Sequence, residues 1–119
     1  MSSSKLWQDA EAAVAEYLKQ LGFEVVATNL RVGHLEIDIV ARRGPLIVVV
    51  EVRTRGVTAW TRGLASVNWK KRERIRRAGQ RLWQRRYRHD CSAERMRFDV
   101  ASVSFIDGDP RVEYVQAAF

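Results

Sequence analysis

Two apolar runs of this 119-residue chain carry acidic side chains at positions typical of buried strands. The first run, residues 35–40, contains Glu36 and Asp38, and the second, residues 47–52, contains Glu51. A carboxylate in such a run is costly to bury unless it is paired, metal-bound or functional. Hard divalent cations prefer carboxylate and carbonyl oxygens, and Mg²⁺ typically takes one or two carboxylates. Asp38 and Glu51 are therefore candidate ligands of a cation that would polarise a phosphoryl oxygen and activate a water.

Spacing brings further polar residues into this group. Arg53 follows Glu51 by two residues, so the two side chains share one strand face. An arginine there would orient a water or stabilise charge that develops on phosphate. Glu11 lies along the apolar stripe of an N-terminal segment, either as an acid that complements a helix dipole or as a carboxylate aimed between helix and sheet. Glu36, and His34 in the turn before it, are secondary candidates.

A structural interpretation exists for the same charges. Glu36, Asp38 and Glu51 could form ion pairs that only close one face of a sheet. Arg53 and Arg55 would be the partners in such a network. The pattern of an acid–x–acid strand beside an acid–x–base strand does not by itself separate the two interpretations.

Periodicity predicts the elements that must position these residues. Apolar residues at 10, 13, 14, 17, 18 and 21 indicate an amphipathic helix that begins at Ser3 or Ser4 and ends at Gly22. Alternation and turn residues predict the rest. The expected segments are strands over 23–28, 35–41, 46–54, 97–106 and 111–115, turns over 29–34, 42–45 and 107–110, loops over 56–64 and 89–95, and a second helix over 66–88. The order α-β-β-β-α-β-β predicts an α/β (mixed α+β) fold in one domain, residues 1–119.

The turn between the second and third strands sets which acids face each other. If this hairpin closes around Gly44-Pro45, residues whose numbers sum to 89 are opposite. Asp38 and Glu51 form such a pair, so we expect their side chains on one face of the sheet. A loop of another size would make them diagonal neighbours, on the same face or on opposite faces.

Positive charge is concentrated in one part of the chain. The formal net charge is +7, but residues 53–97 carry +12 and the remainder −5. Ten basic residues against one acid within residues 70–88 favour a polyanionic partner, nucleic acid and in particular DNA, over a solvated surface or an acidic protein. The side chains expected to contact phosphate, and so to position nucleic acid without reading its sequence, are Arg55, Lys70, Lys71, Arg74, Arg77 and Arg81.

Composition excludes several other classes of protein. The single cysteine, Cys91, excludes an internal disulfide, and no Cys/His cluster has the spacing of zinc ligands. No apolar run approaches the ~20 residues that span a bilayer, and no apolar segment typical of a signal peptide follows the first residues. We therefore expect a cytoplasmic protein without membrane contact.

Several motifs follow one another in a specific order. They are Ala10-Glu11, Tyr17-Leu18, Gly22-Phe23, Asn29-Leu30-Arg31, Glu36-Ile37-Asp38-Ile39-Val40, Val50-Glu51-Val52-Arg53-Thr54-Arg55, Lys70 and Arg97-Phe98-Asp99-Val100. Together they resemble the YraN-like family of small, largely uncharacterised bacterial proteins. The resemblance implies the restriction-endonuclease-like fold of the PD-(D/E)xK superfamily, which includes Holliday-junction resolvases. Its core has the order α-β-β-β-α-β, with a mixed central sheet flanked by helices.

The resemblance also implies roles for individual residues. Asp38 and Glu51 would be ligands of Mg²⁺ (or Mn²⁺), joined by Glu11 and by the backbone carbonyl of Val52. Arg53 stands where the superfamily signature has a lysine, and with the three acids it would complete the catalytic group. Because arginine stays protonated in proteins, Arg53 can hold a water or a phosphate oxygen but cannot act as a general base. A homodimer would allow both strands of a duplex to be cut.

Two functions are compatible with these features. The first is a divalent-metal-dependent endonuclease-like protein that acts on DNA phosphodiesters, including those of branched DNA. The alternative is a catalytically degenerate nucleic-acid-binding module, because Arg53 replaces the signature lysine. Outside this group, Asp99 is expected to pair with a neighbouring arginine, and Trp83 to belong to the core.

Overall fold

The computed structural model describes residues 3–55 and 69–119 as two helices, a π-helical turn and one five-stranded sheet. The elements are α1 (Ser3–Gln20), β1 (Glu24–Val32), β2 (Leu35–Arg43), β3 (Leu46–Arg55), α2 (Trp69–Leu82), η2 (Trp83–Tyr87), β4 (Arg95–Ile106) and β5 (Asp109–Val115). The strand order is β1-β2-β3-β4-β5, in which only the described β3–β4 pair is parallel. The mixed sheet and the order α-β-β-β-α-β-β confirm the predicted fold class.

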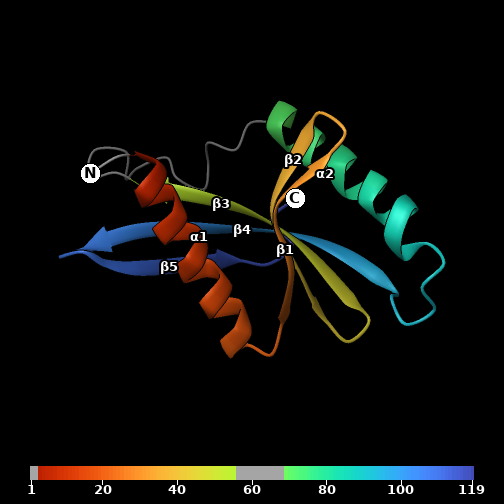
Figure 1. Ribbon diagram of the computed structural model, residues 1–119, viewed down its shortest axis with the longest axis horizontal. Coiled ribbons are helices and arrows are strands. Elements are labelled where there is room, and N and C mark those ends of the chain that lie inside the picture. The colour runs from red at the N-terminus through yellow and green to blue at the C-terminus, as the bar shows by residue number, and fades with distance from the viewer. Residues whose placement is uncertain (1–2, 56–68) are drawn as a thin grey trace.

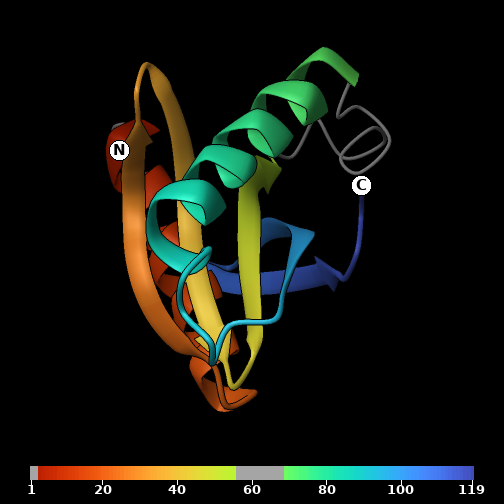
Figure 2. The same cartoon turned by 90° about the vertical axis from the view of Figure 1, so that its right-hand side faces the viewer.

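The two helices lie on opposite faces of the sheet (Figure 1, Figure 2). β3 explains why both faces are covered, since its side chains alternate between two cores. Val48, Val50 and Val52 join the cluster that includes α1, whereas Ile47 and Val49 join the cluster that includes α2. The continuous apolar run of β3 over residues 46–50 is therefore that of a central strand buried on both sides. By the same alternation, the side chains of residues 51 and 53 face α2.

The hairpin of β2 and β3 has the predicted register. Ile39 pairs with Val50 and Val40 with Val49, so paired residue numbers sum to 89. Ile39↔Val50 is the last described backbone pair of this ladder. Beyond it the Val52 N–H donates a hydrogen bond of 2.8 Å to Oδ2 of Asp38. A side-chain carboxylate thus takes the place of a backbone partner where the two strands separate.

Several predicted boundaries were wrong. β1 does not end at residue 28 but continues to Val32, because its far end pairs with β2 at Leu30↔Ile37 and Val32↔Leu35. The predicted turn over 29–34 is reduced to residues 33 and 34. Cross-strand pairing also extends β2 to Arg43, starts β4 at Arg95 and starts β5 at Asp109.

The second helix also differs from the prediction at its C-terminal end. α2 ends at Leu82, and the following residues, Trp83–Tyr87, form a π-helical turn closed by a hydrogen bond from the Arg88 N–H to the Trp83 carbonyl. Trp83 packs, half-buried, against the core on this face, as expected. The predicted loop over 56–64 and the predicted helix start over 66–68 lie outside the described residues.

Asp99 has the structural role expected from its neighbours. Its carboxylate is fully buried and accepts hydrogen bonds from Nε and Nη2 of Arg97 at 2.9 Å each. The Tyr114 hydroxyl and the Ala117 N–H also donate to it, at 2.6 and 2.9 Å. Burial, the largest cause, and the bond to Asp99 raise the pKa of Tyr114, which keeps its proton for this bond. The cluster ties the C-terminal segment to β4.

No described helix is both long and apolar enough to cross a membrane.

Candidate functional site

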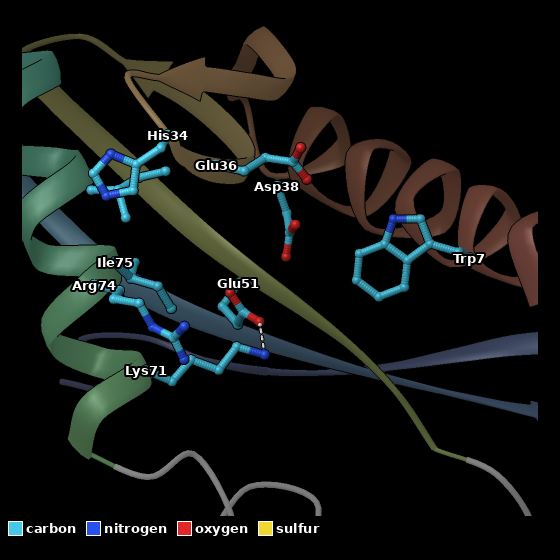
Figure 3. Close-up of a pocket in the computed structure, with 9 residues that line it drawn as sticks. Trp7, His34, Glu36, Asp38, Glu51, Lys71, Arg74 and Ile75 are labelled. Carbon is cyan, nitrogen blue, oxygen red and sulfur yellow. Dashed lines mark ion pairs between the residues drawn. The ribbon is translucent and has the colours of Figure 1, made fainter.

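A pocket of about 320 Å³ lies between α1, α2 and the end of the β1–β2 hairpin. Six predicted residues line it, together with three that were not predicted (Figure 3). The predicted ones are His34, Glu36, Asp38, Glu51, Lys71 and Arg74, and the others are Trp7, Leu35 and Ile75. The tertiary structure therefore brings two of the candidate metal ligands, Asp38 and Glu51, and part of the basic helix into one cavity.

Asp38 and Glu51 reach the pocket from adjacent strands. Asp38 and Glu51 are each one residue beyond Ile39↔Val50, which is the last described backbone pair of the β2–β3 ladder. Figure 3 shows both carboxylates directed into the same space, with Glu36 above them on β2 and Lys71 entering from α2. Because the backbones of β2 and β3 are no longer paired at this point, the space between the strands is available to these side chains.

The pKa of Asp38 is raised to about 7. Burial is the largest cause, followed by repulsion from the carboxylate of Glu51, and Glu11 adds a smaller contribution in the same direction. The hydrogen bond from the Val52 N–H and the positive charge of Lys71 oppose the shift. Burial and the charge of Glu51 thus disfavour the ionised form of Asp38, and a bound cation would favour that form.

Glu51 is paired with a cation from the second helix. Its side chain is buried, and Oε1 lies 2.9 Å from Nζ of Lys71. The side chain of Lys71 is 42% exposed, so the ion pair has one partner that is buried and one that is open to solvent. The ion pair stabilises a charge that would otherwise be costly at this depth.

Glu11 is a buried carboxylate and not an exposed first-turn acid. Only 8% of the residue is accessible to solvent. Its Oε1 accepts a hydrogen bond of 3.0 Å from Nδ2 of Asn29, whereas its Oε2 is buried without a hydrogen-bond partner. Glu11 does not line the pocket, but it lies near enough to raise the pKa of Asp38. The burial favours the interpretation of a carboxylate aimed between helix and sheet.

Arg53 and Val52 have different positions relative to the pocket. Arg53 is half-buried and shares the α2 face of β3 with Glu51, but it is not among the lining residues. Val52 donates its N–H toward β2. In an extended strand the carbonyl of a residue points to the same side as its N–H, so the Val52 carbonyl also faces the edge where Asp38 lies.

Five of the six basic residues predicted to contact phosphate are described, and they lie in three kinds of position. Lys71 and Arg74 line the pocket, whereas Lys70 and Arg77 are exposed on the surface of α2. Arg81 is half-buried, and its Nη1 lies 3.1 Å from where a Cβ on Gly33 would be, so it lies against the tip of the β1–β2 hairpin. The side chain of Arg55, which ends β3, lies outside the described part of the structure.

The pocket offers carboxylate oxygens, which are ligands that Mg²⁺ prefers, but not a complete ligand shell. Within residues 3–55 and 69–119, no three acidic, histidine or cysteine side chains are grouped closely enough to hold an ion. Mg²⁺ usually takes one or two carboxylates and keeps several waters as its other ligands. Asp38 and Glu51 can supply the carboxylates. The raised pKa of Asp38, which lines the pocket, fits a cation at this position. Asp38 and Glu51, with the Val52 carbonyl, are the residues that would hold it.

Sequence reasoning missed Trp7 and Asn29. Trp7 precedes Glu11 by four residues on α1, so the i, i+4 spacing of a helix was the available signal for their common face. Asn29 was assigned to a turn, and only the pairing of β1 with β2 shows that it lies in a strand and donates to Glu11. Leu35 and Ile75 are apolar walls, which carry no sequence signal of a site.

Comparison with known proteins gives consistent matches over most of the chain. The sequence model described as "Uncharacterised protein family UPF0102" matches residues 10–103. A UPF0102 protein of Sorangium cellulosum is 52% identical over 111 residues, which cover 92% of this chain and 77% of the relative. A UPF0102 protein of Anaeromyxobacter dehalogenans is 37% identical, with 96% and 83% covered. One of Alkaliphilus metalliredigens is 33% identical, with 98% and 99% covered.

Proposed function

The chain belongs to the uncharacterised protein family UPF0102, as its YraN-like motifs predict, and from its pocket we propose a divalent-metal-dependent, endonuclease-like protein that acts on DNA phosphodiesters. The observation that carries the proposal is the carboxylate pair Asp38 and Glu51, which shares a pocket with Lys71 and Arg74 of a basic helix. Acids that hold a cation beside bases that attract phosphate are the two parts such a reaction needs.

In the proposed reaction, some residues of the pocket would bind the metal ion and others would bind the phosphodiester. A bound divalent cation polarises a phosphoryl oxygen and lowers the pKa of a water. Asp38 and Glu51 would hold that cation, and the Val52 carbonyl would add an oxygen. Lys71 and Arg74 would attract the negatively charged phosphodiester to the pocket.

Arg53 supports a second candidate function. An arginine remains protonated, so it stabilises charge on phosphate but does not accept a proton from water. It is also absent from the residues that line the pocket. The alternative is therefore a nucleic-acid-binding module that retains the carboxylate site but does not cleave.

A cleavage assay separates the two candidates. The purified protein is incubated with plasmid, single-stranded and four-way-junction DNA in Mg²⁺ or Mn²⁺, with EDTA as a blank. We expect metal-dependent nicking by the wild-type protein. In Asp38→Asn the nicking rate should fall by at least about a hundredfold, because one of the two carboxylate ligands of the metal is removed. Asp107→Asn, the same chemical change at an exposed turn residue, is the matched control.

Each outcome of this assay has a distinct meaning. Cleavage that persists unchanged in Asp38→Asn would remove the carboxylate pair from the mechanism. Metal binding and salt-sensitive DNA binding without cleavage would favour the non-catalytic module. In that case a gain of cleavage in Arg53→Lys would identify residue 53 as the position where turnover was lost.

The proposal extends to the assembly and place of action. Cutting both strands of a duplex uses paired subunits in related folds, so we propose a homodimer. Sedimentation of the protein with and without DNA measures this. We also propose a cytoplasmic location, because DNA is accessible there.

A further inference from the structure

Lys71 both lines the pocket and is partly exposed on the surface of α2. Its ammonium is 2.9 Å from Oε1 of Glu51 inside the pocket, yet its side chain is 42% exposed. It is carried by α2, whose neighbouring residues Lys70 and Arg74 are exposed bases. The ammonium therefore neutralises an acid of the pocket from the same helix that presents positive charge to solvent (Figure 3).

We propose that Lys71 is a shared cation that couples the two binding events of this site: a divalent ion displaces its ammonium from Glu51, and the released ammonium then contacts nucleic-acid phosphate. The proposal rests on the function proposed above, because it assigns Glu51 to the cation and α2 to nucleic acid. It adds that metal and nucleic acid bind cooperatively, through one named side chain.

Charge balance favours the exchange. Two carboxylates, Asp38 and Glu51, line the pocket, and the ammonium of Lys71 lies 2.9 Å from Oε1 of Glu51. A divalent ion supplies twice the charge of the ammonium and binds carboxylate oxygen directly. Once that ion holds Glu51, two cations at the same carboxylate repel each other, so the ammonium leaves.

The chemistry of lysine suits this exchange. Its ammonium is a compact charge on a flexible four-carbon stem with rotatable donors, so it can turn from the pocket to solvent without movement of α2. Phosphate oxygens accept hydrogen bonds from an ammonium as carboxylate oxygens do. The coupling is reciprocal by thermodynamic necessity, so nucleic acid must also raise the affinity of the protein for metal.

Two matched variants test the role of Lys71. Lys71→Gln removes the shared ammonium, and Lys70→Gln removes an equal charge from the preceding, exposed residue. Calorimetric titration with Mg²⁺ and Mn²⁺ gives the metal affinity without nucleic acid. Fluorescence anisotropy with a labelled oligonucleotide gives the nucleic-acid affinity with metal and with NaCl of equal ionic strength, and a gel verifies that the oligonucleotide is intact.

The expected results differ in direction between the two measurements. Lys71→Gln should bind metal about fivefold more tightly than Lys70→Gln, because the competing cation is gone, while its coupling falls to less than about twofold. The wild-type protein and Lys70→Gln should keep a coupling of about fivefold or more, although Lys70→Gln binds nucleic acid more weakly. Lys71→Arg should retain most of the coupling, since it retains a mobile positive charge.

Failure of this inference is distinguishable from failure of the proposed function. Equal metal affinities in the two glutamine variants, or unchanged coupling in Lys71→Gln, would overturn the role of Lys71 while metal and nucleic-acid binding stand. A wild-type protein that binds no divalent ion would overturn both. Circular dichroism verifies that Lys71→Gln is folded, and reduced coupling in a folded Lys71→Arg variant would also count against the exchange.

Discussion

At the scale of single residues, Asp38 is governed by opposing electrostatic effects. Burial, Glu51 and Glu11 favour the neutral carboxyl, and they outweigh the Val52 N–H and Lys71, which favour the carboxylate. The result is a pKa of about 7, compared with 3.8 for an ordinary aspartate. An acid in this state binds a proton or a metal ion near neutral pH, and the two compete for it.

The raised pKa of Asp38 predicts a pH-dependent stability. Well below pH 4 the carboxyl is protonated in the folded and unfolded states, and well above pH 7 it is charged in both. Between these limits the folded state retains the proton that the unfolded state has lost, so the free energy of unfolding falls as pH rises. Asp38→Asn removes this loss and still accepts the Val52 N–H.

Urea unfolding of Asp38→Asn and wild type at pH 4, 6 and 8 measures the effect. We expect the variant to gain roughly 2 kcal/mol relative to wild type between pH 4 and 8, because solvent access reduces the ~4 kcal/mol that three pKa units represent. Asp107→Asn should show no such trend. A stability difference that is the same at all three pH values would contradict the raised pKa.

At the scale of elements, the close approach of α2 to β4 fixes the second helix. A Cβ on Gly79 would lie 2.6 and 2.7 Å from Cε1 and Cζ of Phe98, and 3.2 Å from Sδ of Met96. The Phe98 ring is itself held against Phe119, with ring centroids 5.7 Å apart, so it has little room to move. Gly79 therefore sets the distance at which α2 presents Lys71 and Arg74 to the pocket.

Gly79→Ala should destabilise the protein although alanine is the better helix former. The steric overlap costs about 1–3 kcal/mol, which exceeds the ~1 kcal/mol gained in helix propensity. Thermal and urea unfolding measure the change, and Gln80→Ala, at the adjacent exposed position, should stay within about 0.5 kcal/mol of wild type. A more stable Gly79→Ala variant would show that α2 does not pack this closely.

At the scale of the whole molecule, charge is distributed unevenly. The segment of residues 53–97 has a charge of +12 in a protein whose net charge is +7. Its helix α2 covers one face of the sheet (Figure 2). Lys70, Arg74 and Arg77 are exposed on this helix, and Arg74 also lines the pocket. Nucleic acid that approaches this face would release counterions in proportion to the number of phosphates contacted.

The salt dependence of DNA binding tests which face is used. In Lys70→Gln/Arg77→Gln, the slope of log K against log[salt] should be smaller in magnitude by about 1.4–1.8, because two phosphate contacts are lost. Lys19→Gln/Arg111→Gln makes the same charge change at exposed positions outside the basic segment and should alter the slope by less than about 0.5. Equal changes in the two double variants would indicate a general charge effect.

The sequence by itself determined the order of the elements and the register of the central hairpin. The run from Leu46 to Val52 indicated a buried strand, because it is apolar at every position except Glu51, and the structure shows that it is buried on both faces. Gly44-Pro45 fixed the turn, and the turn fixed which residues of β2 and β3 face each other. The family and the acid pair also followed from local patterns.

Only the tertiary structure decided what surrounds those acids. The ion pair of Lys71 with Glu51 and the hydrogen bond of Asn29 to Glu11 join residues 20 and 18 positions apart on different elements. Periodicity identifies the buried side of a helix but not its distance or rotation over the sheet. Burial and Coulomb energies depend on those distances, so the raised pKa of Asp38 and the pairing of Lys71 emerge only when the helices are in place.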